Sequence, residues 1–419
     1  MVINRRSFIH MAGIMGGGLN LPLPFIESLY PNRSHAMSSL QSSLLPTGAD
    51  SGSLFPFIKT IAHETKFSLS YLSRNYNTLE EYKNTARTKM FELLNYNPPK
   101  IDVNPEVVER VDKGDYIQEK VYFNTAPWFR VPAFVLIPKK GNPPFPGIVD
   151  LHSHGAYYQF GKEKNVEMEH QHPTLTEYKN YYGKRSVGSE LVRRGYLVVT
   201  IDCFGFGERR MILDEDIILG NKPTEELTNE EVDYLNTKMA GAEHQLAKSL
   251  FLAGVSWSGI VVKDDIRTVD YLLSRKEVDK EKIGCIGLSL GGTRSTFLSG
   301  LDERVKCAVI VGAMCSHTPM VKAHVKCHTW INYVPGMYNY LDFPDVTAIR
   351  APLPLMVQHC SQDDLFPREG MESANKKIAE IYKKTDAPEK FSAHFFDVPH
   401  QFNREMQEVA FAWLDKWLK

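Results

Sequence analysis

The stretch Ile283-Gly284-Cys285-Ile286-Gly287-Leu288-Ser289-Leu290-Gly291 decides the fold of this chain of 419 residues. A short apolar run, 283–287, leads directly into a Gly-x-Ser-x-Gly pattern, and the following segment 293–298 is compatible with a helix. A serine on a sharp turn between strand and helix takes a strained backbone conformation, so the positions two before and two after it must lack colliding side chains. Gly287 and Gly291 satisfy that requirement. The pattern predicts a strand, a tight elbow that carries Ser289, and a helix.

This elbow predicts that Ser289 is a nucleophile. It would hold the Ser289 hydroxyl above the edge of a sheet, with the amide of Leu290 at the start of the helix. An amide in that position can stabilise a carbonyl oxygen that becomes negative during attack. A bare Gly-x-Ser-x-Gly pattern also arises by chance in turns of no chemical interest, but its place between a strand and a helix favours the catalytic interpretation.

The rest of the chain predicts the sheet around that elbow. Short continuous apolar runs alternate with helix-length segments, and they lie at 147–151, 196–201, 283–287, 307–311, 354–357 and 391–398. Runs of this kind suit strands buried on both faces, which favours an α/β fold with a mostly parallel sheet flanked by helices. Two earlier segments, 117–123 and 131–138, are typical of antiparallel edge strands.

The order of these segments predicts the domain organisation. Residues 54–96 place apolar side chains at roughly helical spacing and predict two or three helices, so we expect an N-terminal helical extension over 37–105. The catalytic domain is expected over 106–419. Within it, 213–258 is charged and then rich in Ala, Leu and Trp, and is the expected insertion over the site.

A serine alone is a poor nucleophile, so a base must lie beside it and a third group must orient that base. Folds with such an elbow carry the partners in the order Ser, Asp or Glu, then His, each after a strand. Asp363 and His400 follow the last two predicted strands. We predict His400 as base and Asp363 as its orienting acid, with Asp364 as the close competitor. His394 competes with His400, but it lies inside a predicted strand.

Other polar residues are assigned lesser roles. His359 lies at a strand end and could line the pocket, whereas Asp202 and Glu208 precede the serine, which is the wrong order for the acid. The second oxyanion donor should come from the loop 150–155, after an earlier strand. We expect it to be the backbone amide of His154.

A metal site is the alternative chemistry. Two His-x-His pairs occur with two glutamates nearby, at His152, His154, His170, His172, Glu167 and Glu169. Such pairs can chelate zinc, but zinc catalysis would leave the ordered Ser, Asp and His without a purpose. We therefore expect neither a metal nor an organic cofactor.

Composition excludes several classes of protein. The chain has 49 Lys and Arg against 50 Asp and Glu, a formal net charge of −1, and predicts no nucleic-acid partner. Its 43% hydrophobic and 24% charged residues are typical of an ordinary globular protein. The six cysteines show no C-x-x-C pair and predict mostly small buried side chains, and any disulfide pairing is left open.

The N-terminus predicts export. Arg5-Arg6 is followed by a weakly apolar segment too short to span a bilayer, and Ser34-His35-Ala36 offers small residues for cleavage. The segment resembles a twin-arginine export signal over 1–36, which implies folding before export to a periplasm or beyond. No later run approaches 18 apolar residues, so we expect no stable membrane insertion after removal of the signal.

A family resemblance supports these assignments. The run Arg194-Gly-Tyr-Leu-Val-Val-Thr-Ile-Asp-Cys-Phe-Gly-Phe-Gly-Glu-Arg209 looks like the α/β-hydrolase superfamily, specifically its dienelactone hydrolase and acetyl xylan esterase-like branch. Further matches follow in order at 264–272, 278–284, the Ser289 elbow, 301–305, 333–337, 342–346, 351–355, 363–367 and His400.

The resemblance covers about residues 106–419 and implies an eight-stranded sheet. It carries the nucleophile, acid and base roles to Ser289, Asp363 and His400. Two departures stand out: Ser153 replaces the glycine usual in the His-Gly oxyanion loop, and Leu353 replaces the arginine of Ala-Pro-Arg-Pro.

The expected function is two-step acyl transfer on a small-molecule or carbohydrate ester, with an acetyl group favoured. Aromatic candidates for the pocket are Trp257, Trp330, Tyr333 and Tyr338. An exopeptidase is the second enzyme hypothesis, although residues 37–105 are short for a propeller domain. A non-catalytic binding protein on a hydrolase scaffold is the third.

Overall fold

The apolar runs of the sequence form the centre of one sheet. The structure is a computed structural model that describes residues 46–419, so the predicted export signal lies outside the described residues. The strands are β1 (Glu106–Asp112), β2 (Tyr116–Ala126), β3 (Phe129–Pro138), β4 (Phe145–Leu151), β5 (Leu197–Ile201), β6 (Val278–Leu288), β7 (Val305–Val311), β8 (Leu355–Cys360) and β9 (Phe391–Phe396). All six predicted buried runs are strands β4 to β9, which confirms the mostly parallel sheet.

The strand order within the described residues is β1-β2-β3-β5-β4-β6-β7-β8-β9. The pairs β1–β2, β2–β3 and β3–β5 are antiparallel, and the five pairs from β5–β4 to β8–β9 are parallel. This sheet has one strand more than the eight that the resemblance implies, because β1 pairs with the outer side of β2. The strands β2 and β3 are antiparallel as predicted, but neither is an edge strand, because β2 lies between β1 and β3 and β3 lies between β2 and β5.

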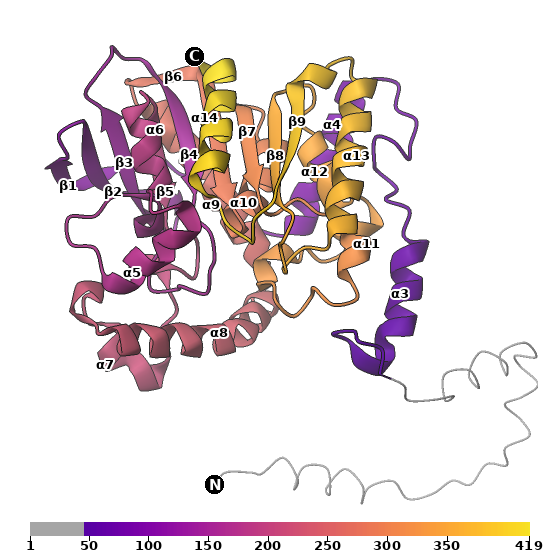
Figure 1. Cartoon of the computed structure of the whole chain (residues 1–419), viewed down its shortest axis with the longest axis horizontal. Helices are drawn as coiled ribbons and strands as arrows, with labels where there is room; N and C mark the ends of the chain where they lie inside the picture. Colours follow the sequence, from indigo (N-terminus) through magenta and orange to yellow (C-terminus); the bar gives the residue numbers. More distant parts are fainter. Residues whose placement is uncertain (1–45) are drawn as a thin grey trace, which may run out of the picture. The chain divides into compact units, whose positions relative to one another are not determined.

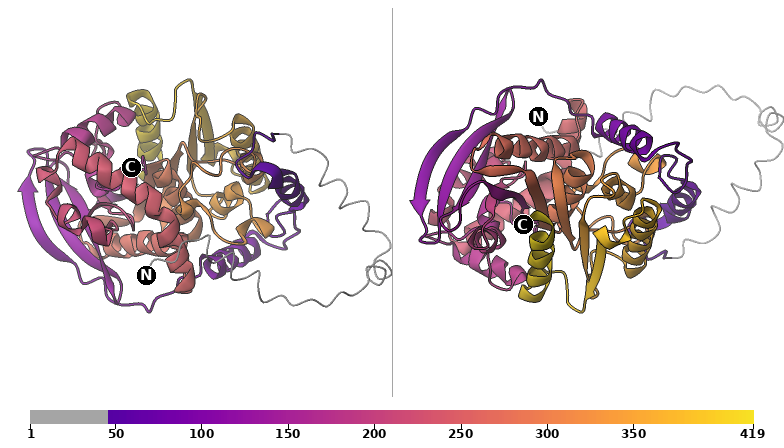
Figure 2. Two further views of the ribbon diagram at one scale, coloured as in Figure 1. Left: turned by 90° about the horizontal axis from the view of Figure 1, so that it is seen from below. Right: turned by 90° about the horizontal axis from the view of Figure 1, so that it is seen from above.

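Helices cover both faces of the sheet (Figures 1 and 2). The helices of the described residues are α3 (Phe55–Glu64), α4 (Leu79–Leu94), α5 (Pro173–Tyr178), α6 (Val187–Arg193), α7 (Ile217–Gly220), α8 (Asn229–Leu252), α9 (Trp257–Ser274), α10 (Leu290–Leu301), α11 (His317–Met320), α12 (Phe343–Ala348), α13 (Arg368–Lys384) and α14 (Arg404–Leu418). Short 3-10 turns lie between them, including Lys162–Asn165.

Strand side chains alternate between two cores, because successive residues of a strand point to opposite faces. On β5, Leu197 and Val199 enter a core shared with α4, α9, α10, α12 and α13. Val198 enters the second core, which contains side chains of α6 and α14. With both faces covered, the central strands are fully buried, which explains why they appear in the sequence as continuous apolar runs rather than as alternating ones.

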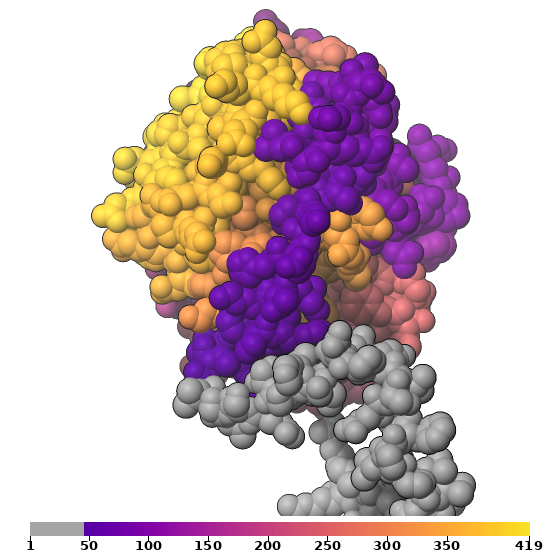
Figure 3. All heavy atoms as spheres, turned by 90° about the vertical axis from the view of Figure 1, so that its right-hand side faces the viewer, coloured from indigo at the N-terminus to yellow at the C-terminus, as the bar shows by residue number. Residues whose placement is uncertain are grey.

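Helix α4 belongs to the main core. The Thr78 side chain caps its N-terminus by accepting a hydrogen bond from the Glu81 amide. Four side chains spaced four residues apart are almost completely buried in the first core, namely Tyr82, Ala86, Met90 and Leu94. Residues Gly48–Lys419 form one compact unit, and Figure 3 shows the N-terminal part of this unit lying against the C-terminal segments.

The carboxyl ends of the parallel strands carry the loops that hold the predicted site residues. His154 follows β4, Ser289 follows β6, Asp363 follows β8 and His400 follows β9. Ligands of open α/β sheets bind at this edge. Helix α8 runs along it below the sheet in Figure 1.

Within residues 46–419, no single helix is long and apolar enough to cross a membrane, although α8 and α9, which meet at a bend of 82°, pass that test when taken together.

Candidate active site

Ser289 lies on a strained elbow between β6 and α10. Its backbone has φ 58° and ψ −119°, a region that residues with a side chain rarely adopt. A Cβ atom on Gly287 would lie 2.4 Å from the Gly291 carbonyl carbon, and one on Gly291 would lie 1.9 Å from the Leu151 carbonyl oxygen. The two glycines therefore let the turn close against itself and against the end of β4.

His400 and Asp363 form a hydrogen-bonded pair. The Nδ1–H of His400 donates to Oδ2 of Asp363 over 2.6 Å, and Oδ1 of Asp363 accepts the Leu365 amide over 2.9 Å. The Asp363 side chain is fully buried, whereas Asp364 is exposed to solvent. A proton on Nδ1 leaves Nε2 of His400 as an acceptor. That atom is buried and has no hydrogen-bond partner in the described part of the chain.

Ser289, His400, Leu290 and His154 line one pocket of about 460 Å³. Leu290 is the first residue of α10, so its amide has no acceptor within the helix. The His154 backbone lies in the loop after β4. The structure thus places Ser289, His400, Leu290 and His154 around one pocket, with Asp363 hydrogen-bonded to His400, but it shows no hydrogen bond between Ser289 and Nε2 of His400.

The competing histidines are occupied elsewhere. His394 lies on β9, where its Nε2 is 2.8 Å from the Ser392 hydroxyl. His359 does not line the pocket but stacks on Phe395, with ring centroids 4.6 Å apart. Its Nε2–H donates to the Asn375 side-chain oxygen over 2.9 Å.

The buried His359 predicts an acid-sensitive stability. Burial lowers its pKa to about 4, whereas an unfolded histidine titrates near about 6.5. Below pH 6.5 the His359 imidazole is protonated in the unfolded chain but stays neutral in the folded chain. The free energy of unfolding therefore falls as the pH drops toward 4. The expected loss is about 3 kcal/mol over that range.

Urea unfolding of wild type and His359→Gln at pH 7, 5.5 and 4.5 measures this effect. The wild type should lose more stability than the variant as the pH falls, because glutamine does not titrate. A difference between the two proteins that stays constant with pH would contradict the prediction.

Three of the four histidines of the metal hypothesis use both ring nitrogens in hydrogen bonds. These three are His152, His154 and His172. In each of them, one ring nitrogen accepts a hydrogen bond from a backbone N–H and the other donates to an oxygen. His170 is exposed and lines a different cavity. Glu167 is bound by the Arg193 guanidinium over 2.5 and 2.8 Å. These residues do not form one ligand set.

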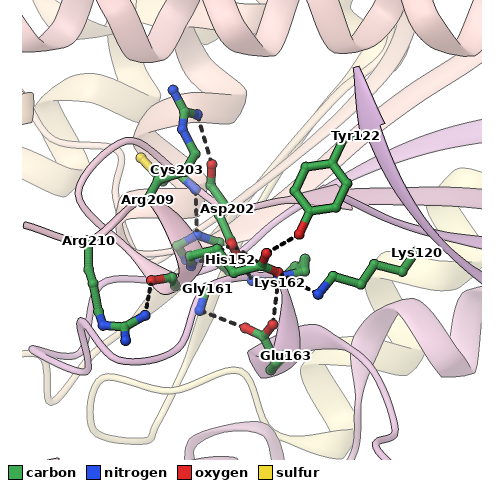
Figure 4. Close-up of polar contacts among 12 residues, drawn as sticks. Lys120, Tyr122, His152, Gly161, Lys162, Glu163, Asp202, Cys203, Arg209 and Arg210 are labelled. Atoms are coloured by element: carbon green, nitrogen blue, oxygen red, sulfur yellow. Dashed lines mark hydrogen bonds and ion pairs between the residues drawn. The ribbon is translucent and has the colours of Figure 1, made fainter. Parts of the chain in front are cut away.

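A separate cluster of three carboxylates surrounds the ammonium of Lys162. Carboxylate oxygens of Glu163, Asp202 and Glu208 lie within 4.8 Å of one another. The Lys162 Nζ lies among them, at 2.7, 3.0 and 2.6 Å respectively (Figure 4). This buried lysine offsets part of their charge, and Lys120 Nζ lies 3.1 Å from Glu208. The Lys162–Asp202 contact joins the loop after β4 to the end of β5.

The pocket aromatics differ from those predicted. Trp257, Trp330, Tyr333 and Tyr338 are absent from the pocket lining; the Trp257 Nε1–H, for example, donates to the Phe204 carbonyl over 3.1 Å. The rings that line the pocket belong to Tyr158, Tyr178, Tyr181 and Phe366. The Tyr-Tyr pairs at 157–158 and 181–182, close after the oxyanion loop, were the available sequence signal.

Sequence reasoning also missed Glu243, which α8 brings to the pocket. Its Oε1 accepts hydrogen bonds from Nε2–H of His154 over 3.1 Å and from the Thr329 hydroxyl over 2.9 Å. Burial by itself raises the pKa of Glu243, but the hydrogen bonds from His154 and Thr329 help to lower it, and the pKa lies below its usual value. The pocket therefore contains a carboxylate beside the predicted oxyanion loop.

A strained serine elbow, an Asp–His pair in the loops after two later strands, and a mostly parallel sheet with helices on both faces define the α/β-hydrolase class. The family model described as the Abhydrolase family matches residues 51–411, and the chain belongs to this family.

The chain is also similar to individual proteins. It is 26% identical over 333 residues to YtaP, a candidate hydrolase of Bacillus subtilis (strain 168), across 79% of this chain and 98% of YtaP. A candidate acetyl xylan esterase from Bacteroides fragilis superposes with a TM-score of 0.65 at 17% identity, over 86% of this chain and 94% of that chain. A glucuronoyl esterase from Solibacter usitatus superposes with a TM-score of 0.57 at 12% identity, over 84% and 97%. These two structures share the fold.

Proposed function

We propose that the protein is a serine hydrolase that cleaves carboxylic esters, with a small acyl group on a carbohydrate as the favoured substrate. The observation that carries the proposal is the Asp363–His400 hydrogen bond, which leaves Nε2 of His400 as an acceptor on a side chain that lines the same pocket as Ser289. In this proposal Ser289 is the nucleophile, His400 the base and Asp363 the residue that holds the imidazole in the required tautomer.

The reaction proceeds in two steps. Nε2 of His400 takes the Ser289 proton as the Ser289 oxygen bonds to the ester carbonyl carbon, and the amides of Leu290 and His154 stabilise the negative oxygen. The carbon–oxygen bond to the alcohol then breaks, and His400 returns the proton to the leaving alcohol. Water attacks the acyl-enzyme by the same route, which frees the acid and restores Ser289.

The chemistry of the pocket supports a hydroxylated substrate. Glu243 offers a carboxylate acceptor, and Tyr181, which is 47% exposed, offers a ring on which a sugar can pack. An anionic acyl group would meet repulsion from the Glu243 charge, which favours a neutral acyl group. Two proteins with a similar fold are a candidate acetyl xylan esterase and a glucuronoyl esterase by name.

A substrate panel tests the proposal. Wild-type protein is assayed with p-nitrophenyl acetate, acetylated xylan, a methyl ester of glucuronic acid and an aminoacyl p-nitroanilide. We expect turnover of the two acetyl esters to exceed that of the other substrates. Preferred cleavage of the anilide would replace the esterase by an exopeptidase, and preferred cleavage of the glucuronate ester would change the acyl group. No turnover of any substrate would favour a binding protein.

We also propose export through the twin-arginine route, supported by the order of Arg5-Arg6, an apolar segment and Ser34-His35-Ala36. Replacement of both arginines by lysine should keep the protein in the cytoplasm of the expressing bacterium, whereas the wild type should reach the periplasm as a shorter chain. Equal fractionation of both proteins would contradict the proposal.

A further inference from the structure

Lys164 lies directly behind the predicted oxyanion loop. It belongs to the 3-10 turn Lys162–Asn165, and its side chain is completely buried. Its Nζ donates to the carbonyl oxygen of Ser153 over 3.0 Å and to that of His154 over 2.9 Å. Two successive peptide groups of the loop are thus held by one ammonium.

Burial of the Lys164 ammonium is energetically unfavourable. Burying an ammonium disfavours its charge, and this burial lowers the pKa of Lys164 to about 7. The carboxylates that face it, Glu163 and Asp202, are already engaged by Lys162. The two loop carbonyls are therefore its strongest polar contacts, with the faces of Tyr178 and Phe206 at 5.3 and 4.7 Å.

Peptide geometry connects this lysine to the pocket. In a trans peptide the C=O and the following N–H point in opposite directions. The Ser153 carbonyl points toward Lys164, so the His154 N–H points away from it. The same argument applies to the His154 carbonyl and the Gly155 N–H. Both His154 and Gly155 line the pocket that contains Ser289 and Leu290.

His152 holds the same peptide from a second direction. The Cys203 amide donates to Nε2 of His152 over 3.0 Å (Figure 4), so the ring proton lies on Nδ1, which is 2.9 Å from the Ser153 carbonyl oxygen. Burial lowers the pKa of His152 well below its usual value, which keeps the ring neutral. The Ser153 carbonyl therefore accepts two hydrogen bonds, one from a neutral ring and one from an ammonium.

We propose that Lys164 is a positioning residue for the oxyanion hole: it fixes the direction of the His154 amide and polarises that peptide, so that the amide binds the negative oxygen of the tetrahedral intermediate. The inference rests on the proposed esterase function and assigns a role to a residue that does not itself contact the substrate. A positive charge on the carbonyl side of a peptide withdraws electrons from its N–H, which strengthens the hydrogen bond to an anion.

The test compares Lys164→Met with a matched control, Lys179→Met. Lys179 is also a buried lysine, 5% exposed, but it donates to the Val166 carbonyl over 2.7 Å and does not contact the oxyanion loop. For each protein we measure kcat and KM for p-nitrophenyl acetate at pH 6.5, the inhibition constant of a trifluoromethyl ketone, and the midpoint of thermal unfolding. The ketone forms a tetrahedral adduct with Ser289, and the negative oxygen of this adduct, which comes from the ketone carbonyl, occupies the oxyanion hole.

We expect Lys164→Met to lower kcat about 100-fold with KM within about threefold of wild type, because a lost oxyanion donor costs about 10²–10³ in kcat. Its inhibition constant for the ketone should rise by a similar factor. Lys179→Met should keep kcat and the inhibition constant within about threefold of wild type. A purely structural role for Lys164 would lower the unfolding temperature without this selective loss of tetrahedral binding.

Lys164→Gln keeps two N–H donors without the charge, and it is the deciding variant where the methionine variant does not fold. We expect it to show a smaller loss of kcat than Lys164→Met, with KM unchanged. A folded Lys164→Gln or Lys164→Met with wild-type kcat and ketone binding would overturn the inference, and so would equal losses in Lys179→Met. If instead the wild type itself turned over no ester, the proposed function would fail before the role of Lys164 was in question.

Discussion

Replacing Ser289 with alanine is expected to lower kcat for p-nitrophenyl acetate by about 10⁴–10⁶-fold, because the Ser289 oxygen forms the acyl-enzyme in the proposed mechanism. The variant should fold like the wild type. Alanine at φ 58° experiences the same backbone strain as serine, since the strain arises from Cβ and not from the hydroxyl. The midpoint of thermal unfolding is therefore expected to change little.

Steady-state assays and labelling with a fluorophosphonate measure this prediction together. The wild type should be labelled at one equivalent and lose activity, while Ser289→Ala should remain unlabelled. Retention of more than about 1% of the wild-type kcat by a pure variant would show that Ser289 is not the nucleophile. It would favour the alternative chemistry of the histidines in the loop after β4.

Replacing Asp363 with asparagine should lower kcat by about 10⁴-fold, the loss typical of a triad whose acid can no longer select the histidine tautomer. An asparagine amide donates where the carboxylate accepts, so it favours a proton on Nε2 of His400 and removes the base. The neighbouring residue provides a matched control. Asp364 is exposed, and its replacement by asparagine should leave kcat within about twofold of wild type.

The pair is measured with the same ester at saturating substrate, with thermal unfolding as the folding control. Asp363→Asn also retains an acceptor for the Leu365 amide, so a large loss of stability is not expected. Equal activity of the two variants, or a larger loss in Asp364→Asn, would contradict the assignment of the acid.

The comparison of Asp363 with Asp364 shows the limit of sequence reasoning at this site. Both residues occupy the same loop, and the order of Ser, acid and base allows either. The choice is made by the turn after β8, which buries one carboxylate against His400 and leaves the next in solvent. Composition and spacing do not determine which of two adjacent side chains in a turn faces His400.

The pocket lining shows a similar limit. Trp257 and Tyr338 were equally good candidates by residue type, but both pack elsewhere, and Tyr338 stacks on His317 with ring centroids 4.0 Å apart. Glu243 could not be found because α8 approaches the oxyanion loop only through the long connection between β5 and α9. Contacts of this kind join residues that are 89 positions apart in the chain.

The sequence by itself determined the six buried parallel strands, the elbow at Ser289 and the order of the nucleophile, acid and base. These features are local: a continuous apolar run requires burial on two faces, and a tight crossing at an elbow requires glycine on either side of the serine. The tertiary structure alone decided which aspartate meets His400, which rings and which carboxylate line the pocket, and that Lys164 holds the oxyanion loop from behind. Those outcomes depend on how distant segments pack against one another, and the free energy of such packing is not contained in any single stretch of the chain.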